Sequence, residues 1–200
     1  MYLEINYKTY IETMATTADL KNGLCINFNH DIYTVVSFQH VKPGKGPAFV
    51  RTRLKSLTNG RVLENTFSAG HEIDITRIIR RPYQFLYKEG DDYVFMQQET
   101  FEQITVPKEH IENPDMYLDG QEVEIVIQEE TDQILTVELP PFVIMEVTYT
   151  EPGIKGDTAT NTLKPATVES GAEIRVPLFV NQGDRIKIDT RDRSYVERAK

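Results

Sequence analysis

The sequence Val41-Lys42-Pro43-Gly44-Lys45-Gly46-Pro47 joins two runs that are rich in strand-forming residues, 32–40 and 48–57. Proline lacks a backbone N–H and glycine weakens regular structure, so this stretch should leave both helix and sheet. The prolines stiffen the connection, and the glycines remove side chains on both sides of Lys45. The pattern therefore predicts a hairpin with one ammonium group at its apex. Such a lysine suits a phosphate contact or a covalent modification, although most turn lysines are ordinary surface residues.

Short runs of β-branched and aromatic residues recur along the whole chain, which predicts an all-β protein of small barrels. Asn59-Gly60 predicts a type I′ hairpin turn before a strand at 62–67. Further strands are expected at 83–87, 93–96, 122–127, 133–139, 142–149, 173–176 and 185–189. The helix candidates are short and lie at 99–103 and around 107–113.

Charge is distributed unevenly along the 200 residues, whose formal net charge is −9. Residues 14–78 carry 8 Lys or Arg and 5 Asp or Glu, residues 79–140 carry 4 and 15, and residues 141–200 carry 9 of each. A strongly acidic average disfavours a nucleic-acid partner. The first third, which contains Lys45, is nevertheless basic, and only the middle third should repel a polyanion. An acidic surface can also serve solubility alone.

These charge steps and the Pro140-Pro141 break divide the chain into pieces. We expect an N-terminal extension at 1–14 that is disordered, a first domain at 15–78, a central acidic domain at 79–140 and a C-terminal domain at 141–200. Each domain has about 60 residues, near the lower limit for independent folding, so contacts between neighbouring domains are expected.

No catalytic or metal-binding pattern is visible in the sequence. The four histidines are scattered, and neither HExxH nor a Cys/His spacing for zinc occurs. Gly44-Lys45-Gly46 lacks the spacing of a phosphate-binding P-loop, and Gly-x-Ser-x-Gly is absent. The single Cys25 permits no internal disulfide, which fits a reducing cytoplasm. No apolar run approaches the roughly 20 residues of a membrane span. We expect no enzyme activity, no cofactor, no metal, no membrane association and a cytoplasmic location.

Four stretches, in chain order, carry a family resemblance. They are Asp19-Leu20-Lys21-Asn22-Gly23-Leu24, the loop at 41–46, Gln98-Glu99-Thr100-Phe101-Glu102-Gln103, and a run from Lys164-Pro165-Ala166-Thr167 through Gly171 and Val176-Pro177-Leu178-Phe179-Val180 to Gly183. With them, the chain resembles bacterial elongation factor P from about residue 15 to its end. Family members usually begin just before the first stretch, so residues 1–13 are either a genuine extension or a start placed too far upstream.

The resemblance implies a KOW/SH3-like barrel followed by two OB-fold barrels, in an L-shaped arrangement like that of tRNA. It implies a factor that binds the 70S ribosome between the P and E sites and stimulates peptide-bond formation at stalled consecutive prolines. We expect this factor to be a monomer. Its partners would be the ribosome, the peptidyl-tRNA that carries proline and, if Lys45 is modified, a lysine-modifying enzyme. Family branches attach β-lysine or an aminopentanol group to a tip lysine and rhamnose to a tip arginine, so the lysine adducts stay open here.

The resemblance also implies the site residues. Lys45 would be the modified lysine, and the tip loop around it comprises Lys42, Pro43, Gly44, Gly46 and Pro47. Arg51 and Arg53, on the strand that leaves the tip, are candidate contacts to tRNA or rRNA, and the alternative is that they are ordinary exposed arginines of a strand. Candidate ribosome contacts in the third domain are Gly156, Asp157, Thr158, Arg191 and Tyr195.

Two other classes of function remain open from the sequence. A generic OB-fold protein that binds single-stranded nucleic acid would present aromatic side chains on a basic groove. The aromatic residues of the middle third lie among 15 carboxylates, which argues against this class. A hydrolase built on a β-barrel is the second alternative, and it would require a convergent polar pocket.

Overall fold

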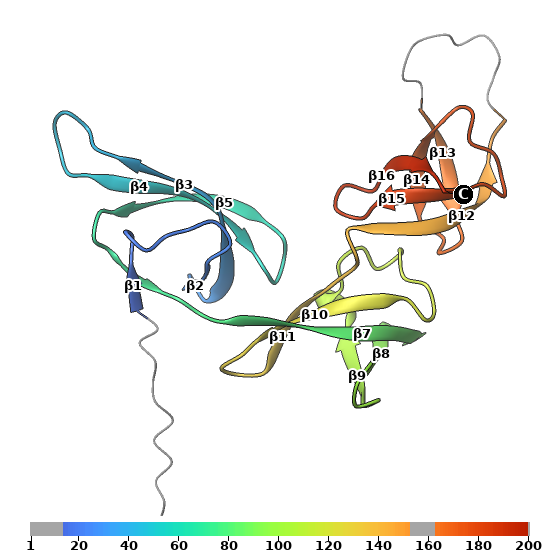
Figure 1. Cartoon of the computed structure of the whole chain (residues 1–200), viewed down its shortest axis with the longest axis horizontal. Coiled ribbons are helices and arrows are strands. Elements are labelled where there is room, and N and C mark those ends of the chain that lie inside the picture. Colours follow the sequence, from blue (N-terminus) through green and yellow to red (C-terminus); the bar gives the residue numbers. More distant parts are fainter. Residues whose placement is uncertain (1–13, 153–162, 200) are drawn as a thin grey trace, which may run out of the picture. The chain divides into compact units, whose positions relative to one another are not determined.

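The computed structural model describes residues 14–152 and 163–199 (Figure 1). These residues form β-strands throughout, with one short 3₁₀ helix, η1 (Lys108–His110). The all-β prediction is therefore confirmed. In this part of the chain no helix is long and apolar enough to cross a membrane.

The N-terminal region consists of a four-stranded antiparallel sheet and a separate two-stranded ribbon. The sheet consists of β2 (Cys25–Phe28), β3 (Asp31–Val41), β4 (Phe49–Ser56) and β5 (Val62–Ser68), in that order. The ribbon pairs β1 (Met14–Thr16) with β6 (Glu72–Asp74). Alternate side chains of these strands face inward. The core they build contains Leu20, Ile26, Tyr33, Val35, Val50, Leu54, Phe67 and Ile73.

A two-residue type I′ connection links β2 to β3. Asn29 and His30 both have positive φ, 50° and 61°, and Phe28 pairs with Asp31 on either side of them. Both central residues of a type I′ turn need a positive φ, and asparagine adopts this conformation more readily than most residues. His30 is thus an exposed turn residue.

The type I′ turn predicted at Asn59-Gly60 is wrong, although the β4–β5 hairpin is present. Of the two residues only Gly60 has a positive φ, and its amide donates to the Ser56 carbonyl at 3.2 Å. The loop is wider because the Asp31 carboxylate anchors it: the hydroxyls of Ser56 and Thr58 donate to Asp31 at 2.7 and 2.8 Å. A long-range contact therefore overrides the local turn preference.

The central region is a five-stranded sheet with the order β11-β10-β7-β8-β9. Its strands are β7 (Ile78–Glu89), β8 (Asp92–Gln97), β9 (Gln103–Pro107), β10 (Glu122–Gln128) and β11 (Gln133–Glu138). The helix candidate at 99–103 is wrong, because residues 98–100 form the β8–β9 turn, Phe101 and Glu102 are irregular, and β9 begins at Gln103. Of the candidate at 107–113, only the three residues of η1 are helical.

The C-terminal region is a closed five-stranded barrel. It consists of β12 (Phe142–Thr150), β13 (Leu163–Val168), β14 (Glu173–Pro177), β15 (Arg185–Asp189) and β16 (Ser194–Arg198). The parallel pairing of β14 with β16, at Arg175 and Ser194, closes the barrel. This closed order, β12-β13-β14-β16-β15, leaves no open sheet edge.

The chain forms two compact units that do not follow the three sequence regions. One contains residues up to Ile79 together with Ile127–Leu135, and the other contains Arg80–Val126 with the chain from Thr136 onward. In the first unit, the Gln128 amide nitrogen donates to the Thr76 hydroxyl at 3.0 Å, and that hydroxyl donates to Glu130 at 2.9 Å. The tip of the β10–β11 hairpin thus belongs to the body that carries the Lys45 loop.

Candidate functional site

The Lys45 loop extends from a long, regular hairpin. β3 and β4 pair without a break from Ser37 opposite Arg53 to Val41 opposite Phe49, after one bulge near Val35. The pairing stops where Lys42-Pro43 begins, because Pro43 has no N–H to donate to the ladder. The seven residues from Lys42 to Ala48 therefore form an irregular loop at the end of the hairpin (Figure 1).

Lys45 lies at the apex of this loop and is exposed. Gly46 has a φ of +105°, a conformation that a residue with a Cβ rarely adopts. Gly44 has no such requirement, and a Cβ at this position would meet nothing within 4 Å. Within the described chain no hydrogen bond or ion pair reaches Lys45. The structure thus places an accessible ammonium group where the sequence predicted one.

A row of cations continues from the loop along the outer face of β4. Arg51 and Arg53 are both exposed, because residues of β4 alternate between the core and solvent. The Arg51 guanidinium lies over the Phe49 ring, 5.5 Å from its centroid. In the register of β4 with β5, Arg53 lies opposite Glu64. Lys55 is exposed two residues further on the same face. We did not single out Lys55 from sequence, although the period of two along a strand could have identified it.

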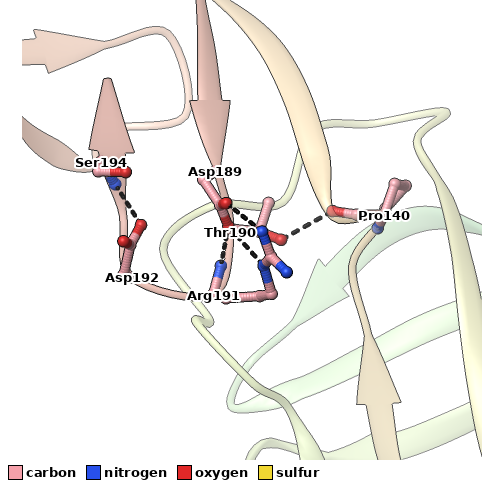
Figure 2. Close-up of polar contacts among 6 residues, drawn as sticks. All are labelled: Pro140, Asp189, Thr190, Arg191, Asp192 and Ser194. Carbon is pink, nitrogen blue, oxygen red and sulfur yellow. Dashed lines mark hydrogen bonds and ion pairs between the residues drawn. The ribbon is translucent and has the colours of Figure 1, made fainter. Parts of the chain in front are cut away.

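Arg191, a predicted contact in the C-terminal barrel, is held by its own neighbours (Figure 2). Its guanidinium donates to both oxygens of Asp189, with 2.9 Å from Nε to Oδ1, and lies 5.8 Å from the centroid of the Phe142 ring. These bonds lower the pKa of Asp189 to about 2, because they stabilise its charged form. Arg191 remains 71% exposed, so one face of the guanidinium stays open to a partner.

The residue after Asp189 has a structural role (Figure 2). Thr190 is buried, its hydroxyl donates to the Pro140 carbonyl at 2.7 Å, and its amide donates to the Pro141 carbonyl at 3.0 Å. Its own carbonyl accepts from the Asn113 side chain at 2.9 Å. The Thr190 backbone and side chain thus join the C-terminal barrel to the linker before it and to the connection between η1 and β10.

Two more residues of that connection contact the C-terminal barrel. Met116 is fully buried among the core residues of the barrel, including Val147 and Ile188. Asp115 forms an ion pair with Arg193. The segment between η1 and β10 therefore completes the hydrophobic core of the next barrel, which the sequence did not reveal.

The remaining predicted contacts divide into two groups. Tyr195 is half-buried and packs against the core of the C-terminal barrel. Its ring makes an edge contact with the Phe179 ring, with 6.3 Å between the two ring centroids. Only part of its ring is therefore available to a partner. Gly156, Asp157 and Thr158 lie outside the described residues, as does the extension at 1–13, while Met14 already belongs to β1.

The chemistry that this arrangement offers is cationic contact. The described residues contain no group of three or more His, Cys, Asp and Glu side chains that could hold a metal ion. An exposed ammonium at the end of a hairpin, with exposed arginines on the adjoining strand, suits the phosphates and the polar groups of a nucleic acid.

Comparison with known proteins covers almost the whole described chain. Family models match residues 16–73 as the elongation factor P KOW-like domain, residues 78–135 as the elongation factor P OB domain, and residues 143–198 as the elongation factor P C-terminal domain. Elongation factor P of Flavobacterium johnsoniae is 60% identical over 187 residues, which are 94% of this chain and all of the relative. Elongation factor P of Amoebophilus asiaticus is 58% identical over 94% of this chain and 98% of its own length.

A KOW-like domain, an OB domain and an elongation factor P C-terminal domain, in this order, define a translation factor, which is a non-enzymatic class of protein. The chain belongs to the elongation factor P family, and it is a translation elongation factor. The expected all-β fold of a KOW-like domain followed by small barrel domains is therefore confirmed.

Proposed function

We propose that this factor binds the 70S ribosome between the P and E sites and stimulates peptide-bond formation when consecutive prolines stall synthesis. The observation that carries the proposal is the exposed Lys45 at the apex of the β3–β4 hairpin, above the cationic row that contains Arg51 and Arg53. A cation on such an arm can hold the acceptor end of a peptidyl-tRNA through its phosphates.

The mechanism in this proposal is positional. Proline is a poor acceptor amine and restricts the backbone on both sides of itself. A factor that holds the peptidyl-tRNA in a reactive geometry lowers the barrier without supplying a base, because orientation alone contributes several kcal/mol in general. Lys45 would make the contact nearest the reaction, and a modifying enzyme would lengthen it. Arg51 and Arg53 would contact tRNA or rRNA phosphates.

The proposal includes the organisation of the chain. The domains would be 15–78, 79–140 and 141–200, and the protein would act as a cytoplasmic monomer. In the C-terminal domain, Arg191 and Tyr195 would contact the ribosome together with Gly156, Asp157 and Thr158. The open face of Arg191 supports its part in this contact.

Translation of a reporter with a Pro-Pro-Pro stretch, in extract or cells that lack the factor, tests the proposal. Lys45→Ala should abolish rescue and change the free energy of unfolding by no more than about 0.5 kcal/mol, because the side chain is exposed. Lys45→Arg keeps the charge but cannot carry a lysine adduct, so it should fail nearly as completely if modification is required. The intact mass of the natively produced protein would identify the adduct.

Lys42→Ala is the matched control, since Lys42 is an exposed cation of the same loop and should matter less. Full rescue by Lys45→Ala would refute the proposed role of Lys45. Rescue by Lys45→Arg alone would show that a bare charge is sufficient. Binding to isolated oligonucleotides as tight as binding to ribosomes would favour the alternative, a generic protein for single-stranded nucleic acid. The acidic central region argues against that alternative.

A further inference from the structure

Phe101 stands out on the central sheet because of its exposure. Its side chain is 69% exposed, more than any other large hydrophobic side chain in the described chain. It follows the turn of the β8–β9 hairpin, and the acidic residues Glu99 and Glu102 flank it. An apolar ring that is left in water gains nothing for the fold.

The backbone of Phe101 is also unfavourable for a phenylalanine. Its φ is +61°, in the left-handed region that glycine and asparagine tolerate and that a bulky side chain rarely adopts. The hairpin fixes this conformation, because the Phe101 amide donates to the Gln97 carbonyl at 3.0 Å and the Gln97 amide donates to the Glu102 carbonyl at 2.9 Å. A glycine or an asparagine would fit the same turn with less strain.

Neither the exposure nor the conformation of Phe101 serves the described fold. Backbone strain of this kind occurs at sites where a side chain must be presented in one direction. Exposed aromatic side chains that a rigid element holds in place are typical anchors of protein interfaces. The turn therefore has the properties of a preformed contact point.

The charges around Phe101 identify the chemistry of the partner. Glu99 and Glu102 lie within two residues of Phe101 in the chain and are exposed, and the region from 79 to 140 has 15 acidic and 4 basic residues. Such a surface repels the phosphates of RNA and attracts basic protein surfaces. We propose that Phe101 docks into an apolar pocket with a basic rim on a protein component of the ribosome. This inference rests on the proposed function, which supplies the ribosome as the place of contact.

Affinity for purified 70S ribosomes tests the contribution of the ring. Phe101→Asn introduces a residue that tolerates a positive φ, so the thermal midpoint of unfolding should be equal to or above that of the parent. The affinity of this variant for ribosomes should fall at least fivefold. Tyr87→Asn is the control, because Tyr87 is a half-exposed aromatic residue of the same sheet, and its affinity should stay within twofold of the parent. Parent-like affinity of Phe101→Asn would overturn the inference.

A photo-crosslink identifies the class of partner without removing the aromatic ring. Phe101→p-benzoylphenylalanine, irradiated on purified 70S ribosomes, should attach to one ribosomal protein at a site with Lys or Arg around it. Attachment to rRNA would overturn the inference, and so would no attachment when this variant binds with parent-like affinity.

The charge on the rim gives an independent test. The double variant Glu99→Lys, Glu102→Lys should weaken binding most at low salt, where the attraction is least screened. If the parent protein rescues Pro-Pro-Pro synthesis and Phe101→Asn binds ribosomes and rescues equally well, this inference is refuted but the proposed function is not. A parent protein that does not bind ribosomes would refute both the inference and the proposed function.

Discussion

The Thr190 hydroxyl donates a 2.7 Å hydrogen bond to the carbonyl of Pro140, which ties the end of β15 to the start of the C-terminal region (Figure 2). Proline in the linker has no N–H to offer, so its carbonyl is the group through which the linker can be fixed. The Thr190 side chain is buried. The loss of one buried hydrogen bond leaves the acceptor unsatisfied and has a measurable effect.

We therefore expect Thr190→Val, which keeps the shape of the side chain, to lower the free energy of unfolding by about 1 kcal/mol or more. Urea denaturation measures this change. Thr148→Val is the control, because the Thr148 hydroxyl also donates to a backbone carbonyl, at 3.1 Å, but at an exposed site. If the two variants lost the same amount of stability, the Thr190 bond would have no special role in the junction.

Met116→Ala should destabilise a barrel to which Met116 does not belong in sequence. Met116 is fully buried in the core of the C-terminal barrel, so truncation should cost about 2–5 kcal/mol, the range for large-to-small core changes. Hydrogen exchange should show faster exchange in β12 and β15, with β4 unchanged. Met96→Ala, at a half-buried position on β8, should cost less. Slower or unaltered exchange in β12 would contradict this assignment.

The Asp189–Arg191 pair predicts an acid transition of local structure. The pKa of Asp189 is about 2, below the ordinary value of 3.8, so the pair contributes fully above about pH 4 and is lost as pH falls toward 2. NMR titration of the carboxyl carbon measures this pKa directly. Arg191→Ala should raise the pKa toward its ordinary value, whereas Arg175→Ala on β14 should leave it unchanged. An Asp189 pKa near 4 in the parent protein would contradict the geometry.

Gly46→Ala and Gly44→Ala form a matched pair in the Lys45 loop. Gly46 has a φ of +105°, so a Cβ there should cost about 1 kcal/mol or more and shift the direction of Lys45. Gly44 has an ordinary φ and space for a Cβ, so its substitution should stay within about 0.5 kcal/mol. Thermal unfolding and the Pro-Pro-Pro reporter would separate the two variants. Equal behaviour would mean that the loop relaxes freely around either change.

Several strand positions were predictable from sequence because apolar and polar residues alternate along them. The strand expected at 185–189 coincides with β15, and the Lys45 hairpin appears as the loop sequence predicted. β13 was missed because Pro165 interrupts its pattern. In the barrel Pro165 pairs with Arg175 of β14, and the Thr150 hydroxyl donates to the Pro165 carbonyl.

The features that were not predictable depend on contacts between distant segments. Asp31 widens the loop that contains Asn59-Gly60, although that dipeptide favours a tighter turn. The turn before Phe101 resembles the start of a helix in sequence, because no glycine marks its left-handed residue. For the candidate site, exposure of Lys45, Arg51 and Arg53 followed from local pattern, whereas the pairing of Arg191 with Asp189 and the burial of Met116 required the tertiary structure.

The place of Met116 has a consequence for the order in which the protein is made. A nascent chain leaves its ribosome N-terminus first, and domains generally fold in that order. Met116 therefore emerges before β12, the first strand of the barrel whose core it completes. We expect a separate fragment that starts at Pro140 to fold poorly even though it contains every strand of the barrel. During synthesis, the segment that contains Met116 would be present before the last barrel folds, and the barrel would close around its apolar side chain.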